Sequence, residues 1–159
     1  ISRLRRDHPT FRRSRFFDGR PITRGEGEPL PDLEWLKPDG TAMSPGDWDA
    51  GFGRTLGMYL NGQGIHGVDA RGEPITDVSF LLFSSAHDEA VPLVLPDADH
   101  ATAWDVIVDT AGNHVDGDRL EAGAACSVGA HAFLVLREHR SAAGAGDPTV
   151  SATLERPTG

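Results

Sequence analysis

The stretch from residue 54 to residue 140 alternates between apolar and polar residues with a period of two, and Gly, Asp or Pro interrupts it every few residues. Leu56, Met58 and Leu60 show this alternation, which is typical of a strand with one buried face. Other short runs suited to strands are Phe80–Phe83, Val91–Leu95, Trp104–Asp109 and Ala132–Leu136. Because no helical pattern of about 12 residues lies among these runs, they predict an all-β fold, an antiparallel β-sandwich or barrel, rather than parallel βαβ units.

Two of these runs, Phe80–Phe83 and Val91–Leu95, are separated by Ser84–Ala90, a connection of hairpin length. In a third run, Trp104, Val106 and Val108 recur at every second residue, which predicts that all three face the same side of a sheet. The runs therefore predict the strands and also which of their side chains share a face.

The first residues predict a short amphipathic helix. Ile1, Leu4, His8 and Phe11 recur at intervals of three and four, so a helix would place them on one face. Pro9 lacks a backbone donor, so the helix is expected to end there or to restart with Pro9 in a first turn. The helix and the turn after it form a predicted N-terminal unit, residues 1–24.

Residues 25–53 predict a long ordered loop before the sandwich domain of residues 54–140. Prolines and glycines are dense between residues 20 and 50, which excludes a regular helix or a central strand. Large apolar residues punctuate the same stretch, and such residues are rare in flexible linkers. Residues 141–159 are poor in apolar residues and predict a mobile tail.

Charge is distributed unevenly along the chain. Residues 1–24 hold eight arginines and two aspartates, a net charge of +6, within a chain whose formal net charge is −9. The acidic remainder would repel nucleic acid, so the basic segment predicts contact with an acidic protein surface. No run approaches the roughly 18 apolar residues of a membrane-spanning helix, and no secretory leader is apparent. Cys126 is the only cysteine, which suits a reducing, cytoplasmic location.

Several other motifs resemble binding or catalytic sites but suit other roles better. The G-x-G-x-x-G pattern of residues 62–67 lacks the following helix that would bind a dinucleotide phosphate. Asp109, Asn113, Asp116 and Asp118 do not have calcium-loop spacing, and the histidines show no metal-site pairing. We therefore expect no metal and no cofactor. The pairs Asp47/Asp49 and Asp97/Asp99 could serve acid/base glycosidase chemistry, but a solvated turn suits them better.

Trp35 and Trp48, with Asp39 between them, are the candidate carbohydrate-binding residues. Tryptophans on an irregular loop often stack on sugars or anchor an interface. The alternative is that both indoles pin the loop to the core. The sequence leaves these two interpretations open.

Specific segments give the chain a family resemblance. LRRDHPTFRR at residues 4–13 and RFFDG at residues 15–19 resemble the last barrel helix and exit of bacterial glycogen debranching enzymes of the isoamylase type. The resemblance continues in order to about residue 138, through DLEW at 32–35, PDG at 38–40, DW at 47–48 and LNG at 60–62. That family belongs to the α-amylase superfamily, in which a catalytic (β/α)₈ barrel precedes an all-β C-terminal domain.

The resemblance implies a non-catalytic domain of an enzyme that hydrolyses α-1,6 branch linkages in glycogen. The catalytic carboxylates of such enzymes lie on barrel strands upstream of the last barrel helix, so no residue here inherits a catalytic role and the chain alone should be inactive. The implied partners are the barrel and, through it, branched α-glucan. Without the barrel, the face of Ile1, Leu4 and Phe11 is expected to be exposed or to cover a non-native neighbour. The alternative is a stand-alone carbohydrate-binding or protein-interaction module.

Overall fold

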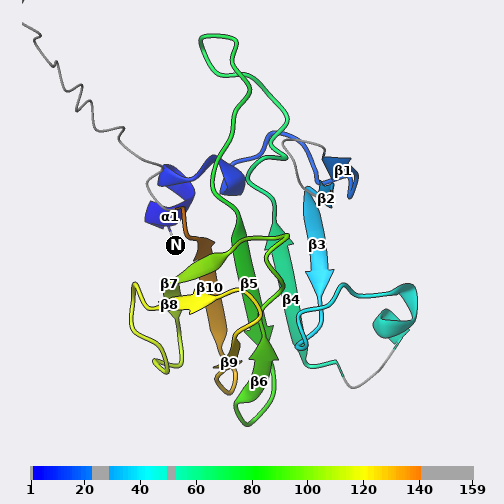
Figure 1. Ribbon diagram of the computed structural model, residues 1–159, viewed down its shortest axis with the longest axis vertical. Coiled ribbons are helices and arrows are strands. Elements are labelled where there is room, and N and C mark those ends of the chain that lie inside the picture. The colour runs from blue at the N-terminus through cyan, green and yellow to red at the C-terminus, as the bar shows by residue number, and fades with distance from the viewer. Residues whose placement is uncertain (1, 23–28, 50–52, 141–159) are drawn as a thin grey trace, which may run out of the picture.

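The computed structural model describes residues 2–22, 29–49 and 53–140. Its main layer is a six-stranded sheet in which every neighbouring pair is antiparallel. In spatial order the strands are β3 (Leu33–Leu36), β4 (Thr55–Leu60), β5 (Phe80–Ser85), β10 (Phe133–Glu138), β7 (Ala103–Asp109) and β8 (Arg119–Glu121). This sheet forms the centre of the molecule (Figure 1).

A second, smaller layer packs on one face of the six-stranded sheet. It is the antiparallel ribbon of β6 (Val91–Val94) and β9 (Ala125–Val128). The short pair β1 (Pro21–Ile22) and β2 (Leu30–Pro31) forms a third sheet. The described residues thus form an all-β fold with one short N-terminal helix, as the sequence predicts, and none of their helices is long and apolar enough to cross a membrane.

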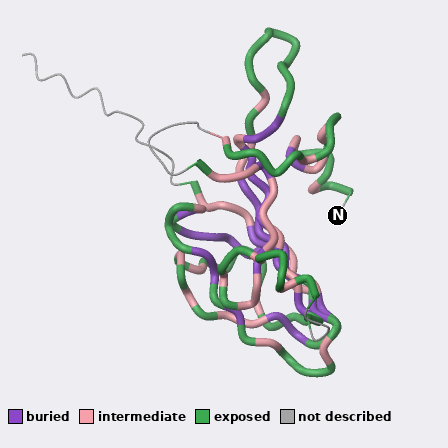
Figure 2. Tube along the Cα trace, turned by 90° about the vertical axis from the view of Figure 1, so that its right-hand side faces the viewer, coloured by how far each residue is buried: buried purple, intermediate pink, exposed green. Residues whose placement is uncertain are grey.

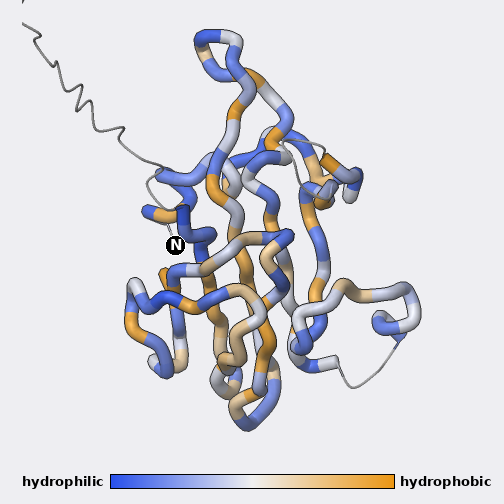
Figure 3. The backbone as a smooth tube through the Cα atoms, viewed as in Figure 1, coloured by the Kyte–Doolittle hydropathy of each residue, from blue (hydrophilic) through white to orange (hydrophobic). Residues whose placement is uncertain are grey.

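The main core fills the space between the two layers. Tyr59, Leu81 and Phe83 project from the large sheet, while Leu93 and Val128 project from the ribbon. Trp104 and Leu136 also belong to this cluster, and both are fully buried. Figure 3 shows the apolar residues gathered along these strands, and Figure 2 shows the buried residues in the same central region. The apolar residues that alternate along the strands are therefore the ones that hold the layers together.

The opposite face of the large sheet carries a second apolar cluster. Leu60, Phe80, Leu82 and Val135 are its buried members. The N-terminal segment lies across part of this outer face, with α1 (Ser2–Asp7) followed by the 3₁₀ turn Pro9–Phe11. The helix ends before Pro9 and a new turn starts at it, as predicted.

The expectation that Leu4 and Phe11 would be exposed is wrong. Both side chains are partly buried against the outer face of the sheet, and the rings of Phe11 and Phe80 lie 4.7 Å apart. The reason is that the outer face is itself apolar, so it offers these side chains a partner within the chain. Ile1 lies outside the described residues, as do residues 141–159, the predicted tail.

The five predicted strands are present as β4, β5, β6, β7 and β10. Two details differ from the prediction. Leu33–Leu36, expected as loop, forms the edge strand β3 on β4, because the two prolines flanking it do not interrupt the short ladder. Ser84–Ala90 does not close a hairpin: β5 pairs with β4 and β10, whereas β6 crosses to the ribbon and pairs with β9.

A β-bulge also changes the faces along β7. Val135 pairs with Val108 and Leu136 pairs with Val106, so Ile107 has no partner on β10. An extra residue of this kind reverses the alternation beyond it. Trp104 and Val106 therefore lie in the main core, whereas Val108 lies in the outer cluster, contrary to the predicted single face.

Candidate functional site

Trp35 and Trp48 are brought together by different elements. Trp35 lies on β3 and Trp48 on the 3₁₀ turn Pro45–Asp49, and their ring centroids are 5.5 Å apart at 86°, an edge-to-face contact. Trp35 is half-buried, whereas 52% of Trp48 is exposed. Such aromatic pairs are favourable beyond their buried area. Trp35 thus packs against the indole of Trp48, which faces solvent.

A carboxylate cap fixes the turn that carries Trp48. The carboxylate of Asp47 accepts hydrogen bonds from the backbone N–H and the hydroxyl of Ser44, both at 2.7 Å. These bonds lower the pKa of Asp47 below its ordinary value. Asp47 therefore acts as a structural cap at the start of the turn.

Asp39 occupies a tight turn after β3. Its carboxylate accepts hydrogen bonds from the hydroxyl of Thr41 at 2.6 Å and from the backbone N–H of Thr41 at 3.0 Å, and these bonds lower its pKa. Gly40 follows at φ +80°, where a Cβ would meet the carbonyl oxygen of Val94 at 2.6 Å. Only glycine suits this position, because the turn packs directly against the backbone of β6.

The structure disfavours catalysis by the carboxylate pairs Asp47/Asp49 and Asp97/Asp99. A glycosidase acid needs a raised pKa, whereas the pKa of Asp47 is lowered. Asp97 accepts a hydrogen bond from the backbone N–H of Asp99 at 3.2 Å, so it caps its own turn. Both pairs thus belong to turns, and the exposed Trp48 remains the best candidate for ligand contact.

His100 joins two segments in a way that the sequence does not indicate. Its ring nitrogens lie 2.8 Å from Glu34 on β3 and 3.3 Å from Asp97, and its ring meets Tyr59 edge-to-face. Burial lowers the pKa of His100, but the bonds to both carboxylates outweigh it, so the net pKa is raised. The ring fastens the β6–β7 connection to the strand that carries Trp35.

Two carboxylates hold the N-terminal segment on the sandwich, and the sequence alone does not single them out. Asp77 lies 2.9 Å from the ring nitrogen of His8 and accepts bonds from the N–H and the hydroxyl of Thr10 at 3.0 and 2.9 Å. Asp32 accepts the backbone N–H groups of Asp18 and Gly19 at 3.2 and 2.9 Å. These bonds connect the N-terminal segment to β2, β3 and the end of the β4–β5 connection.

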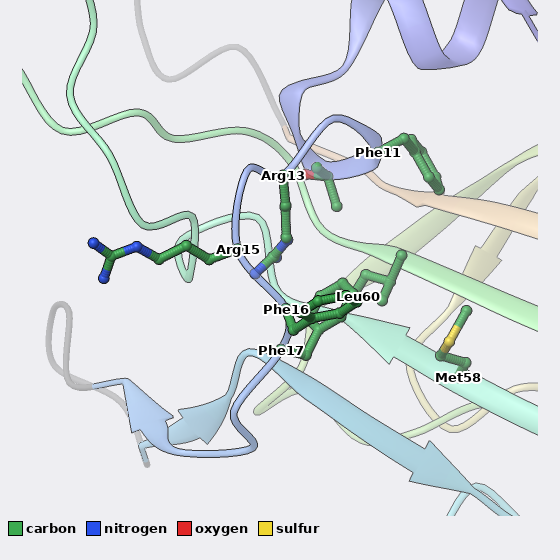
Figure 4. Close-up of a pocket in the computed structure, with 8 residues that line it drawn as sticks. Phe11, Arg13, Arg15, Phe16, Phe17, Met58 and Leu60 are labelled. Carbon is green, nitrogen blue, oxygen red and sulfur yellow. The ribbon is translucent and has the colours of Figure 1, made fainter.

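Arg13 completes the attachment. Its guanidinium lies 3.7 Å from Asp32, donates to the carbonyl oxygens of Asn61 at 2.6 Å and Gly64 at 2.9 Å, and stacks over the ring of Phe17. Figure 4 shows Arg13 and Phe17 beside Leu60, while Arg15 points away from them. Arg13 thus serves as a tether between the N-terminal segment and the β4–β5 connection.

Asp18, Asp32 and His66 bring three possible metal ligands within 4.8 Å of one another. Asp32 is already hydrogen-bonded to two backbone N–H groups, and the positive charge of Arg13 lies beside it. A cation would therefore meet an occupied carboxylate and a like charge. The cluster suits attachment of the N-terminal segment better than metal binding.

The remaining motifs serve packing and turns. A Cβ on Gly62 or Gly64 would lie 2.3 or 2.2 Å from a neighbouring atom, so the first two glycines of the G-x-G-x-x-G pattern permit close packing. Asp109 accepts the backbone N–H groups of Ala111, Asn113 and His114 at 2.9 Å each, as a turn residue does.

Comparisons with known proteins bear on the whole domain. Residues 32–142 match a family model described as "Isoamylase, C-terminal". The curated proteins called "Glycogen operon protein GlgX homolog" from Mycobacterium bovis and Mycobacterium tuberculosis are 43% identical to the chain over 136 residues. The match covers 85% of this chain and 19% of each relative, so the chain spans about a fifth of their length.

Proposed function

This chain belongs to the isoamylase C-terminal family, and from that premise we propose that it is the non-catalytic C-terminal domain of an enzyme that hydrolyses α-1,6 branch linkages in glycogen. The observation that carries the proposal is the family match across residues 32–142, from just before β3 to beyond β10. The glycogen operon relatives support it as well. We also propose a role in glycogen breakdown in the cytoplasm.

The domain is proposed to stabilise the catalytic part and to supply no chemical group to the reaction. Its turn carboxylates cap backbone N–H groups, as Asp47 and Asp109 do. We expect the 159-residue chain to release no reducing ends from glycogen beyond a heat-inactivated control, and the longer polypeptide to release them readily. A reducing-end assay of both proteins on glycogen measures this directly. Release by the 159-residue chain would show that the domain is itself an enzyme.

We further propose that Trp48 borders the substrate groove of the longer enzyme and stacks on a glucan ring. Its half-exposed indole, held by the edge of Trp35 and by the capped turn, is pre-organised for such a contact. The exposed carboxylate of Asp39 is proposed to accept a hydrogen bond from a sugar hydroxyl. Trp35 is assigned a supporting role, because it is half-buried beside Trp48.

Trp48→Ala in the longer enzyme is expected to raise KM for branched glucan about fivefold, since an exposed stacking contact contributes about 1 kcal/mol. The melting temperature and kcat should stay close to those of the parent, because the lost contact stabilises the bound substrate and the transition state equally. Val115→Ala is the control, since Val115 is an apolar residue with 71% exposure outside the Trp35–Trp48 pair and outside the N-terminal segment. A fall in melting temperature with an unchanged KM would instead mean that Trp48 pins the turn.

A further inference from the structure

The strand that carries Trp35 also determines where Trp48 lies. β3 is at the edge of the large sheet and pairs with β4 (Figure 1). Along its outer edge, the backbone N–H of Met43 donates to the carbonyl oxygen of Trp35 at 2.8 Å. Met43 lies just before the turn Pro45–Asp49, which carries Trp48. A shift of β3 would therefore move both indoles.

His100 connects β3 to the segment between β6 and β7, residues 95–102. Its Nε2 lies 2.8 Å from the carboxylate of Glu34, the residue before Trp35. The ring meets Tyr59 of β4 edge-to-face at 4.9 Å, and only 12% of the His100 side chain is exposed. Consecutive strand residues point to opposite faces, so His100 holds β3 from the face opposite the Trp35 indole.

Both nitrogens of the His100 ring face carboxylates. Nδ1 lies 3.3 Å from Asp97, and Nε2 contacts Glu34 as described above. An ionised carboxylate only accepts hydrogen bonds, whereas a neutral imidazole has a single N–H to donate. The two bonds together therefore require the imidazolium. Loss of its proton would leave a ring nitrogen lone pair facing a carboxylate.

The groups around the ring favour the charged form. Glu34 faces it from β3, Asp97 from its own connection and Tyr59 from β4. Burial lowers the pKa of His100, but the hydrogen bonds to Glu34 and Asp97 outweigh burial and raise it above the ordinary value of 6.5. Burial raises the pKa of Tyr59 to about 12, so Tyr59 stays neutral while His100 titrates.

The direction of this shift gives the sign of the pH dependence. A raised pKa in the folded chain means that the bonds of His100 contribute fully below about pH 6.5 and are lost as the pH rises through the raised value. The bond to Asp97 is the longer one, and 74% of the Asp97 side chain is exposed, so this bond is the weaker of the two. The connection 95–102 should therefore loosen first.

We propose that His100 is a positioning residue for the Trp35–Trp48 pair: its imidazolium holds β3 in the arrangement that presents Trp48 to a glucan, and loss of the proton releases β3. This inference rests on the proposed function of Trp48. It makes the contact with glucan dependent on pH, tighter at acidic than at alkaline pH. His100 acts through Glu34 and does not itself touch the sugar.

An NMR titration of the unmodified 159-residue chain tests whether His100 controls the indoles. We expect the indole N–H signals of Trp35 and Trp48 to shift with the same midpoint as the His100 ring, above the ordinary value of 6.5. His100→Gln should abolish this shift. His114→Gln is the matched control and should leave it intact, because the half-buried ring of His114 donates to the backbone carbonyl of Ser127. Indole signals that stay constant through the His100 midpoint would overturn the proposal.

The pH dependence of KM in the longer enzyme tests the consequence for glucan binding. Relative to the parent, His100→Gln is expected to raise KM for branched glucan about threefold at about pH 6 and to leave it unchanged at about pH 9, with kcat unchanged at both. Titration of catalytic groups is common to the two proteins and cancels in the ratio. The same KM ratio at both pH values would mean that His100 is merely structural, which would refute its positioning role.

The two experiments also separate this inference from the proposed function on which it rests. Trp48→Ala is assayed in the same longer enzyme under the same conditions. If it leaves KM unchanged while both indole signals follow His100, the sugar contact of Trp48 is refuted, and the control of the indole pair by His100 stands.

Discussion

Asp32→Ala is expected to lower the free energy of unfolding of the chain by about 3–5 kcal/mol, the cost of removing one partner from a buried ion pair. Asp32 is 1% exposed, and the side chain of Arg13 beside it is 8% exposed. The substitution removes the carboxylate nearest to that guanidinium and leaves the N–H groups of Asp18 and Gly19 without their acceptor. Urea unfolding followed by tryptophan fluorescence measures the change.

Asp69→Ala is the matched control for this prediction. Asp69 also accepts two backbone N–H bonds, from Arg71 at 2.8 Å and Glu73 at 3.0 Å, but it lies in an exposed turn without a buried arginine. Its loss should cost about 1 kcal/mol. An equal cost at both positions would mean that Asp32 contributes only turn hydrogen bonds and that Arg13 does not depend on it.

The strands that can be predicted from the sequence are those whose own residues are mostly large and apolar. β4 and β5 carry large apolar side chains over most of their length, and both lie inside the sheet. By contrast, β8 holds three residues, two of them charged, and β9 is built of small residues. These two strands exist because β7 and β6 offer them a partner ladder, and local sequence does not encode that pairing.

The face of a residue is harder to predict than its strand. Val108 follows the period-two pattern of Trp104, yet the bulge at Ile107 places it on the other side of the sheet. Nothing in the local sequence marks the bulge, because it depends on how β7 aligns with β10. The place of Val108 in the outer cluster could therefore not be predicted from periodicity alone.

For the candidate site, too, the residues could be predicted from the sequence but their arrangement could not. Trp35 and Trp48 could be selected from the sequence because tryptophan is rare and its chemistry is distinctive. Their edge-to-face arrangement could not, because it depends on β3 pairing with β4. The roles of Asp32 and Asp77 were also hidden, since the chain holds 24 acidic residues and only the fold brings these two to the N-terminal segment.

Phe83→Ala is expected to lower the free energy of unfolding by about 3–5 kcal/mol, because it removes a buried ring and leaves a cavity. Phe83 is fully buried in the core between the layers. A Cβ added to Gly57 on the neighbouring strand would lie 2.6 Å from its ring, so the backbone of β4 already approaches it closely. The sheet therefore has little freedom to collapse into the space, and the cost should fall at the upper end of this range.

Phe16→Ala provides the control for the same chemical change at the surface. Phe16 is 96% exposed, so its removal should change the free energy of unfolding by less than about 0.5 kcal/mol. Guanidinium unfolding of both variants and the parent gives the two differences under one set of conditions. A decrease in the free energy of unfolding of less than about 1 kcal/mol for Phe83→Ala would contradict the two-layer core. A ring buried between the large sheet and the β6–β9 ribbon should contribute more than that.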